Sequence, residues 1–233
     1  MDTYAIIPTM PGREDVLVKA ANSLAPQVDA LFIYLNKIEK LPNALSSIPN
    51  IEYVMGPDRG SASRFYLGKK VKGYMAFCDD DLEYHPGYIE RMKEKVEEYG
   101  RRCVITMHGR NLNPQMYSFC GLGHGRSRRC YPCLHPQARD IEVHMAGTGA
   151  LMYHSDTMQI SEDDFKANNL DDAEFSILCQ ERKIPIICIA HDVMLTYLNP
   201  KGDTIWDMTM RDPFPLLRVL NSHQWEFFTN DHD

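Results

Sequence analysis

Three adjacent carboxylates, Asp79, Asp80 and Asp81, follow directly on the apolar run 73–78. Like charges crowded at the end of a strand repel one another, and a bound cation is the simplest compensation. Alternate residues of an extended segment point the same way, so Asp79 and Asp81 can share one ion. Carboxylate oxygens suit Mg²⁺ or Mn²⁺, and such an ion can hold a diphosphate and neutralise its charge as it leaves. The alternative is that the triplet caps the helix expected near Pro86.

One irregular segment contains five residues of the types that can bind zinc, cysteine and histidine: Cys120, His124, Cys130, Cys133 and His135. Cys130 and Cys133 have the two-residue gap of zinc knuckles, and Cys120 with His124 or His135 could complete four ligands. A structural Zn²⁺ would explain how a long irregular segment stays ordered. The alternative is a loop with unpaired thiols.

The same segment is rich in arginine. The whole chain has a net charge of −7, yet residues 101–139 hold seven arginines and no Asp, Glu or Lys. This asymmetry suggests a local anionic partner, with Arg126, Arg128 and Arg129 as candidate contacts. Arginines interleaved with aromatic residues suit phosphate backbones and stacked bases, so the candidates are a nucleic acid with a modified base, a phosphorylated lipid or a phosphorylated polymer. The alternative is a solvated loop whose arginines pair with distant carboxylates.

Short apolar runs alternate with helical patterns over most of the chain. This order is typical of an α/β fold in which helices cover both faces of a mostly parallel sheet. Ligands bind such sheets at the carboxyl ends of the strands, where the polar loops 9–15 and 79–85 are expected. Residues 108–140 and the tail from 192 show no such pattern. The expected strands are 4–8, 30–35, 51–55, 73–78, 104–107, 144–153 and 185–190, and the expected helices are 14–25, 61–72, 86–99 and 171–182.

The composition is that of a globular protein, with 44% hydrophobic and 24% charged residues. No apolar run reaches the roughly 18–20 residues of a membrane helix, so no membrane span is expected. The N-terminus lacks the basic region of a signal peptide, and the odd number of cysteines, seven, points to a reducing compartment. We therefore expect a cytoplasmic protein with one domain over residues 1–233. The sequence does not indicate an oligomeric state.

Five short segments, taken in order, resemble glycosyltransferase family 2, the nucleotide-sugar-dependent enzymes of the GT-A fold. Ile6–Thr9 looks like the first strand of that family, and Gly60–Arg64 is similar to the segment before its aspartate motif. Phe77–Asp81 resembles the DxD motif itself. Asn169–Phe175 resembles the acidic pair of the family, and Lys183–Ile186 the strand that follows the next helix. The similarity extends over roughly residues 4–195.

The resemblance implies a divalent-metal site beside a nucleotide-sugar site. Asp79 and Asp81 would meet Mn²⁺ or Mg²⁺ and the donor diphosphate, with His191 as a further metal or phosphate contact. Taken alone, His191 is equally well explained as a satisfied histidine after a buried strand. The donor-binding residues that the resemblance implies are Pro8, Thr9, Arg13, Asp58, Arg64 and Asp80.

The resemblance also implies a catalytic base. Asp172 matches it, but this sequence has Asp171 where the family more often has glutamate, which leaves open which of the two is the base. Without the family pattern, these carboxylates form an acidic first turn that the helix dipole favours. Gly147 and Gly149 match a small-residue segment on the acceptor and donor-sugar side, and the alternative is a tight turn.

The expected activity is therefore an inverting, metal-dependent transfer of a sugar from a nucleoside diphosphate sugar to a hydroxyl of an acceptor, which could be a modified nucleic-acid base or another anionic molecule. Residues 1–107 would bind the donor, 108–140 would form the Cys/His/Arg-rich insertion, and 141–233 would form the acceptor and catalytic half. Two alternatives are a zinc-stapled nucleic-acid-binding module without catalysis and a metal-dependent nucleotidyltransferase. The latter normally needs a phosphate-binding Gly/Lys loop, and Gly147–Gly149 is too short for one.

Overall fold

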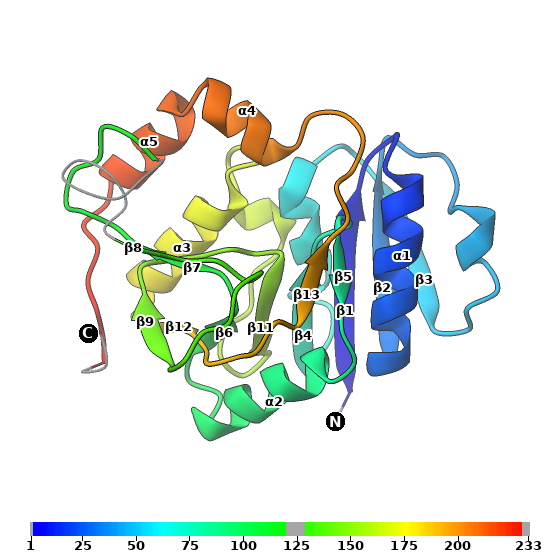
Figure 1. Cartoon of the computed structure of the whole chain (residues 1–233), viewed down its shortest axis with the longest axis horizontal. Coiled ribbons are helices and arrows are strands. Elements are labelled where there is room, and N and C mark those ends of the chain that lie inside the picture. Colours follow the sequence, from blue (N-terminus) through cyan, green and yellow to red (C-terminus); the bar gives the residue numbers. More distant parts are fainter. Residues whose placement is uncertain (1, 120–128, 230–233) are drawn as a thin grey trace.

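The computed structural model describes residues 2–119 and 129–229. The chain folds around an eight-stranded sheet with the order β3-β2-β1-β4-β11-β6-β12-β9, and helices cover both of its faces (Figure 1). Two smaller sheets have the orders β10-β7-β8 and β13-β5. The α/β class expected from the sequence is therefore confirmed.

The first four strands of the main sheet are parallel, and each begins and ends within two residues of the run predicted for it. After β1 the chain adds β2 and β3 on one side and then places β4 on the other side of β1. Connections that leave β1 and β4 in opposite directions make a topological switch point, where such sheets bind ligands beyond the carboxyl ends of the strands. These strands are β1 (Thr3–Thr9), β2 (Ala30–Asn36), β3 (Ile51–Gly56) and β4 (Tyr74–Cys78).

The other half of the sheet mixes strand directions. β11 runs antiparallel between β4 and β6, β6 and β12 are parallel, and β9 is antiparallel to β12. The prediction of one strand over 144–153 is wrong, because the turn at 147–149 divides it into β10, which pairs with β7, and β11. Ala150 pairs with Cys78, so this turn lies beside the start of the acidic triplet. The bounds are β6 (Val104–Thr106), β9 (Ile141–Val143), β10 (Met145–Ala146), β11 (Ala150–His154) and β12 (Ile186–Cys188).

Alternation along the strands separates two hydrophobic cores. Ile7 of β1 packs in one core with α1 and α2, whereas Ile6 packs in the other with Phe65 and Phe175, because neighbouring side chains of a strand point to opposite faces. The segment 61–72, expected as a helix, is a 3₁₀ helix that ends at Leu67. The covering elements are α1 (Glu14–Leu24), α2 (Tyr88–Glu98), η3 (Gly60–Leu67) and α3 (Asp171–Glu181).

The segment 108–140 contains regular structure that the sequence did not indicate. β7 (Gly109–Asn111) pairs antiparallel with β8 (Arg129–Tyr131) on one side and with β10 on the other. The expectation of an irregular segment is therefore wrong for these residues. Strands of three residues are too short to show an alternating pattern, and only the pairing of β7 with β10 and with β8 defines them.

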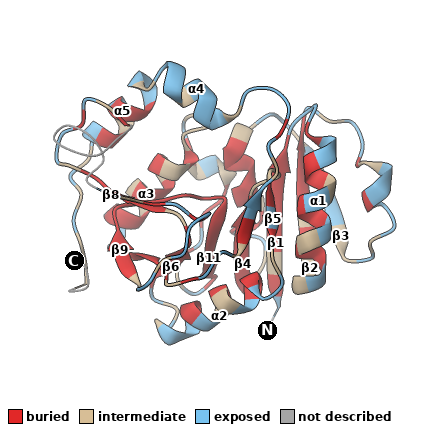
Figure 2. Cartoon of the chain, in the orientation of Figure 1, coloured by how far each residue is buried: buried red, intermediate tan, exposed pale blue. Residues whose placement is uncertain are grey.

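The tail also contains elements that were expected to be irregular. β13 (Leu195–Tyr197) pairs with β5 (Leu82–Tyr84), and the helices α4 (Ile205–Arg211) and α5 (Phe214–Asn221) follow. α4 has no buried residue, so no face of it packs into a core, and it lies as an exposed segment above the body of the chain (Figure 2). α5 buries three leucines in a cluster with residues of the insertion and of α3.

Three further 3₁₀ turns complete the connections: η1 (Ala25–Gln27), η2 (Asn43–Leu45) and η4 (Glu162–Asp164). Within the described residues, the helices are too short and too polar for any of them to cross a bilayer.

Candidate functional site

The acidic triplet lies at the switch point, where β1 and β4 end side by side. Thr9, the last residue of β1, donates a hydrogen bond from Oγ1 to Asp80 Oδ2 at 2.7 Å. Arg13, just before α1, places Nη1 3.3 Å from Asp81 Oδ2 and 3.7 Å from Asp80 Oδ1. The triplet and the loop after β1 thus form one polar cluster. Two residues predicted to bind a donor, Thr9 and Arg13, are part of it.

Arg64 connects this cluster to the acidic pair at the start of α3. Its Nη2 lies 2.7 Å from Asp79 Oδ1, and its Nε lies 3.1 Å from Asp171 Oδ2. The guanidinium is buried by η3 and β4. Burial opposes its charge, but the carboxylates of Asp79 and Asp171 raise the pKa of Arg64 above its ordinary value. Arg64 therefore stays charged and holds the two acidic groups together.

The two carboxylates of the acidic pair have different surroundings. Asp171 is buried and accepts hydrogen bonds from Ser61 Oγ and Thr148 Oγ1, in addition to its ion pair with Arg64. Asp172 Oδ1 lies 2.8 Å from Thr148 N and 2.6 Å from Thr148 Oγ1, and its side chain lines a cavity of about 240 Å³. A hydroxyl has one proton to donate, so Thr148 serves one carboxylate at a time. Only Asp172 of the pair lines this cavity.

The site contains more negative than positive charge. Five carboxylates, those of the triplet and of the acidic pair, face the guanidinium groups of Arg13 and Arg64. Burial, together with the charges of neighbouring aspartates, raises the pKa of Asp80 to about 7 and that of Asp81 to about 6. Burial and the charge of Asp171 raise the pKa of Asp172 to about 6. Groups shifted in this way are characteristic of functional sites.

The donor set of the triplet fits a hard divalent cation. Arg64, Thr9 and Arg13 occupy several of its oxygens, but Asp79 Oδ2 and Asp81 Oδ1 have no hydrogen-bond or ion-pair partner among the described residues. Carboxylate oxygens of this kind suit Mg²⁺ or Mn²⁺. Within residues 2–119 and 129–229, no three His, Cys, Asp or Glu side chains are arranged as a metal centre. The metal site of Asp79, Asp81 and His191 therefore stays a prediction.

Three other predicted site residues make their contacts with residues outside the triplet. Asp58 follows β3 and pairs with Lys37 at 2.6 Å, and this contact lowers the pKa of Asp58. His191 pairs with Gln137 through the backbone, and its Nδ1 lies 2.7 Å from the carbonyl oxygen of Asp192. Pro8 is part of β1 and faces Tyr34 of β2. Within the described part of the chain, no hydrogen bond or ion pair joins Asp58 or His191 to the triplet.

The zinc and arginine predictions fall largely outside the described residues, as is the case for Cys120, His124, Arg126 and Arg128. Of the others, Cys133 is buried, Cys130 lies in β8, and His135 follows in a turn. These three form no metal cluster in the described part of the chain, so zinc stays a prediction. Arg129 is exposed, with its guanidinium 5.1 Å from the ring centre of Tyr131.

Gly149 lets Asp79 approach the turn at 147–149. A Cβ atom at Gly149 would lie 1.7 Å from Asp79 Oδ2, closer than any real contact. Tyr84 holds both strands in place, because its hydroxyl donates to Gly149 O at 2.7 Å and accepts from Asp79 N at 2.6 Å. Gly147 is restricted by a different neighbour, since a Cβ there would lie 2.9 Å from the His108 side chain. The two glycines predicted to line the acceptor side thus permit close packing, Gly149 against Asp79 of the triplet and Gly147 against His108.

Sequence reasoning missed several residues that build the site. Asn36, the last residue of β2, donates from Nδ2 to Thr9 O at 3.2 Å and to Ser63 Oγ at 3.0 Å. Its place at the carboxyl end of a predicted strand was a usable signal. Thr148 and Ser61 were not singled out, because their hydrogen bonds to the acidic pair depend on residues far apart in the sequence.

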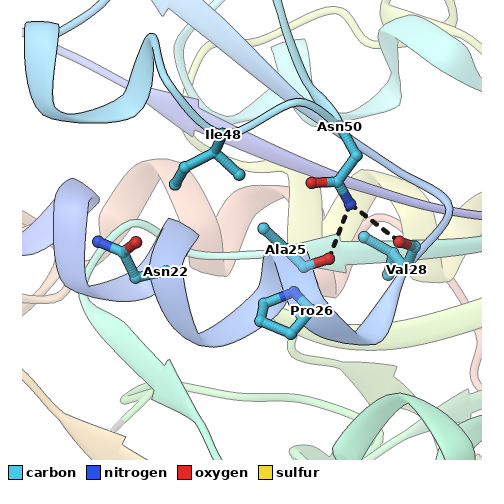
Figure 3. Close-up of a pocket in the computed structure, with 6 residues that line it drawn as sticks. All are labelled: Asn22, Ala25, Pro26, Val28, Ile48 and Asn50. Atoms are coloured by element: carbon cyan, nitrogen blue, oxygen red, sulfur yellow. Dashed lines mark hydrogen bonds between the residues drawn. The ribbon is translucent and has the colours of Figure 1, made fainter.

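A second cavity, of about 400 Å³, lies away from this chemistry. It opens between the end of α1 and the segments that lead into β2 and β3 (Figure 3). It therefore lies at the amino ends of these strands, whereas the triplet lies at the carboxyl end of β4. Asn50 donates from Nδ2 to Ala25 O at 2.8 Å and to Val28 O at 3.0 Å. The residues that line it carry no titratable side chain, so we assign it no reaction.

Comparisons with known proteins give little about function. No family model matches this sequence, and no curated protein matches it. Among solved structures, the chain is similar to the 2-C-methyl-D-erythritol 4-phosphate cytidylyltransferase of Francisella tularensis, with 13% sequence identity, coverage of 91% of this chain and 99% of that chain, and a TM-score of 0.41. A similarity this weak carries no argument. Membership of the glycosyltransferase family therefore stays a hypothesis.

The close contact at Gly149 gives a first prediction. Gly149→Ala should lower the melting temperature and displace the Asp79 carboxylate, because the new methyl group would overlap it. If the new methyl group overlaps that side chain, Gly149→Ala should destabilise the protein much less once Asp79 is also replaced by alanine. The double variant should therefore be little less stable than Asp79→Ala alone. Thermal unfolding of the four proteins checks this. Additive losses in the double variant would contradict it.

The buried carboxylates make stability depend on pH. Asp80 has a pKa of about 7 in the folded chain against 3.8 ordinarily, so between about pH 4 and 7 the folded state binds more protons than the unfolded state. The free energy of unfolding should therefore fall as the pH rises through this window. Asp80→Asn removes this titration, and its melting temperature relative to wild type should rise from pH 5 to pH 8, measured without divalent metal.

The control for this experiment is Asp163→Asn, whose side chain is 71% exposed. Its melting temperature relative to wild type should stay nearly constant over the same range. If the melting temperature of Asp80→Asn relative to wild type does not rise with pH, the pKa of Asp80 is not raised by its burial in the folded chain.

Proposed function

We propose that this protein transfers a sugar from a nucleoside diphosphate sugar to a hydroxyl of an acceptor, with the assistance of Mn²⁺ or Mg²⁺. The observation that carries the proposal is the position of Arg64. It joins the triplet at the switch point to the acidic pair, and Asp172 of that pair lines a cavity. The triplet, which would hold the donor diphosphate, and a carboxylate that could act as a base are thus neighbours, and this supports the proposal because a displacement at a sugar carbon needs such an arrangement.

On the donor side, the residues of the chain would bind and orient the nucleotide. Asp79 and Asp81 would hold the divalent ion, which neutralises charge on the leaving diphosphate when bound. Thr9 and Arg13 lie beside them at the end of β1, where a nucleotide would enter the switch point. Asn36 fixes the end of β1 from the neighbouring strand, so the binding surface is built on the rigid part of the sheet.

On the acceptor side, Asp172 would take the proton of the attacking hydroxyl. The acceptor oxygen would bond to the anomeric carbon while the bond from that carbon to the diphosphate oxygen breaks, and the diphosphate would leave with the electron pair. A base is most effective when its pKa lies near the working pH, and the pKa of about 6 for Asp172 meets this condition. Asp171 would be a positioning residue, since Ser61, Thr148 and Arg64 occupy its oxygens.

A nucleotidyltransferase is the second candidate, favoured by one observation. Arg13 is a buried cation at the carboxyl end of β1, and it could contact a triphosphate where the sequence lacks a Gly/Lys loop. The two reactions break different bonds and release different products. Sugar transfer releases a nucleoside diphosphate, whereas nucleotidyl transfer from a nucleoside triphosphate releases pyrophosphate.

Nucleotide binding should require both the metal and the triplet. Thermal unfolding with uridine, guanosine or cytidine diphosphate should show stabilisation by at least one of them in the presence of Mn²⁺, and little without it. At a ligand concentration 100 times the dissociation constant, the gain is about 2.7 kcal/mol. Asp81→Ala should lose the response, and Asp163→Asn should keep it. A response of equal size in Asp81→Ala, or none to any nucleotide in wild type, would contradict the proposal.

Asp172→Asn should separate chemistry from binding. The amide cannot take a proton, so sugar transfer, or slow hydrolysis of the sugar nucleotide followed by mass spectrometry, should fall by about 10²–10⁴-fold. Stabilisation by the nucleoside diphosphate with Mn²⁺ should persist. Glu181→Gln, which removes an exposed carboxylate from the other end of α3, is the matched control and should retain activity. Normal turnover by Asp172→Asn would show that another group is the base.

A further inference from the structure

The cavity beside Asp172 contains one feature that the proposed function does not use. Arg110 lines it together with Phe119 and Trp206, and Asp172 is its acidic member. Its volume of about 240 Å³ is below the roughly 300–1,000 Å³ of sites that enclose a drug-sized ligand. A cavity of this size takes one end group of a molecule.

Arg110 is held on a rigid element. It is the middle residue of β7, where it faces Met145 of β10 on one side and Cys130 of β8 on the other. Strands on both sides fix its backbone, and Asp172 is fixed by the first turn of α3 and by the hydrogen bond that it accepts from the backbone N of Thr148. The fold therefore sets the backbone positions of both charged residues, which lie on regular secondary structure and not in a loop.

The guanidinium of Arg110 is buried without an anion. The residue is only 8% exposed, and its guanidinium carbon lies 4.5 Å from the ring centre of Phe119 and 5.5 Å from that of Trp206. Within residues 2–119 and 129–229, its side chain has no hydrogen-bond or ion-pair partner. Two aromatic faces offset part of the cost of burying a charge, but a buried cation is normally paired. The cavity gives a pairing anion room to enter.

The remaining polar group at this cavity does not compete for that anion. Burial, together with the charge of Arg110, lowers the pKa of His108 to about 4, so the imidazole is neutral near pH 7. Arg110 is thus the cation and Asp172 the anion among the charged residues that line this cavity. A molecule that satisfies both has an oxyanion at one place and a hydroxyl at another.

We propose that Arg110 binds an oxyanion of the acceptor, a phosphate or a carboxylate, while Asp172 faces the acceptor hydroxyl. That the bound molecule is the acceptor rests on the proposed function. The planar fork of arginine matches both oxyanions. The ring of Trp206 beside the guanidinium makes occupation of the site observable by fluorescence.

The test is a titration of tryptophan fluorescence in a Trp225→Phe background, which leaves Trp206 as the remaining tryptophan. Inorganic phosphate and acetate are added in separate series at constant ionic strength, with no nucleotide and no divalent metal. We expect a saturating change with at least one of them. A tighter response to phosphate indicates a phosphorylated acceptor, and a tighter response to acetate a carboxylated one. No saturating response to either anion overturns the proposal.

Arg110→Gln in the same background should bind the anion about 10- to 100-fold more weakly, the factor expected for a lost charge-assisted hydrogen bond. Arg218→Gln, which removes an exposed arginine from α5, is the matched control and should bind as the parent does. If Arg110→Gln does not fold by circular dichroism, Arg110→Lys replaces it and should bind more weakly than the parent, because the fork is lost. Parent-like binding by the Arg110 variant overturns the proposal.

The anion titration and the nucleotide experiment fail independently. Saturable phosphate or acetate binding that depends on Arg110 supports the anion site even when no nucleoside diphosphate stabilises the protein. Metal-dependent stabilisation by a nucleotide, together with no anion binding at Arg110, overturns this inference and leaves the donor site intact.

Discussion

The buried guanidinium of Arg64 is the contact on which the rest of the site depends. It lies between the carboxylate of Asp79, which directly follows the strand β4, and that of Asp171 in the first turn of the helix α3, two positions far apart in the sequence. Removing one partner of a buried ion pair costs about 3–5 kcal/mol, because the other charge is left uncompensated. The relative position of the triplet and the acidic pair is therefore fixed by electrostatics as well as by packing, and Asp172 is fixed with them.

The crowded carboxylates of this site also lower the stability of the folded chain. Burial holds three carboxyl groups, Asp80, Asp81 and Asp172, at raised pKa, so near neutral pH each must either keep a proton or tolerate the repulsion of its neighbours. Natural proteins keep such arrangements where a ligand offsets the repulsion. The proposed divalent cation would do so through the oxygens that Arg64, Thr9 and Arg13 leave free. In the absence of ligand, the carboxylates that build the site therefore destabilise the folded chain.

Local pattern was enough to predict the parallel strands, the three main helices and the place of the acidic triplet at the end of a strand, because each depends on neighbouring residues. It was not enough where long-range pairing decides. The run 144–153 is apolar throughout, and only the pairing of β10 with β7 shows that it is two strands. Asp171 and Asp172 are equivalent in sequence, and Ser61 and Arg64 distinguish them. Arg110 belonged to a recognised arginine-rich stretch, but its role depends on Trp206 in the tail.

The antiparallel strand β11 has a consequence for how the chain is made. It supplies the neighbour of β4 on the side away from β1, and its first residue, Ala150, pairs with Cys78. A ribosome adds about 5–20 residues per second, so the edge of β4 waits several seconds for its partner during synthesis. An unpaired apolar edge is open to association with other chains. The nascent polypeptide therefore passes through a stage in which the residues just before the triplet need shielding, and this stage ends only when β11 emerges.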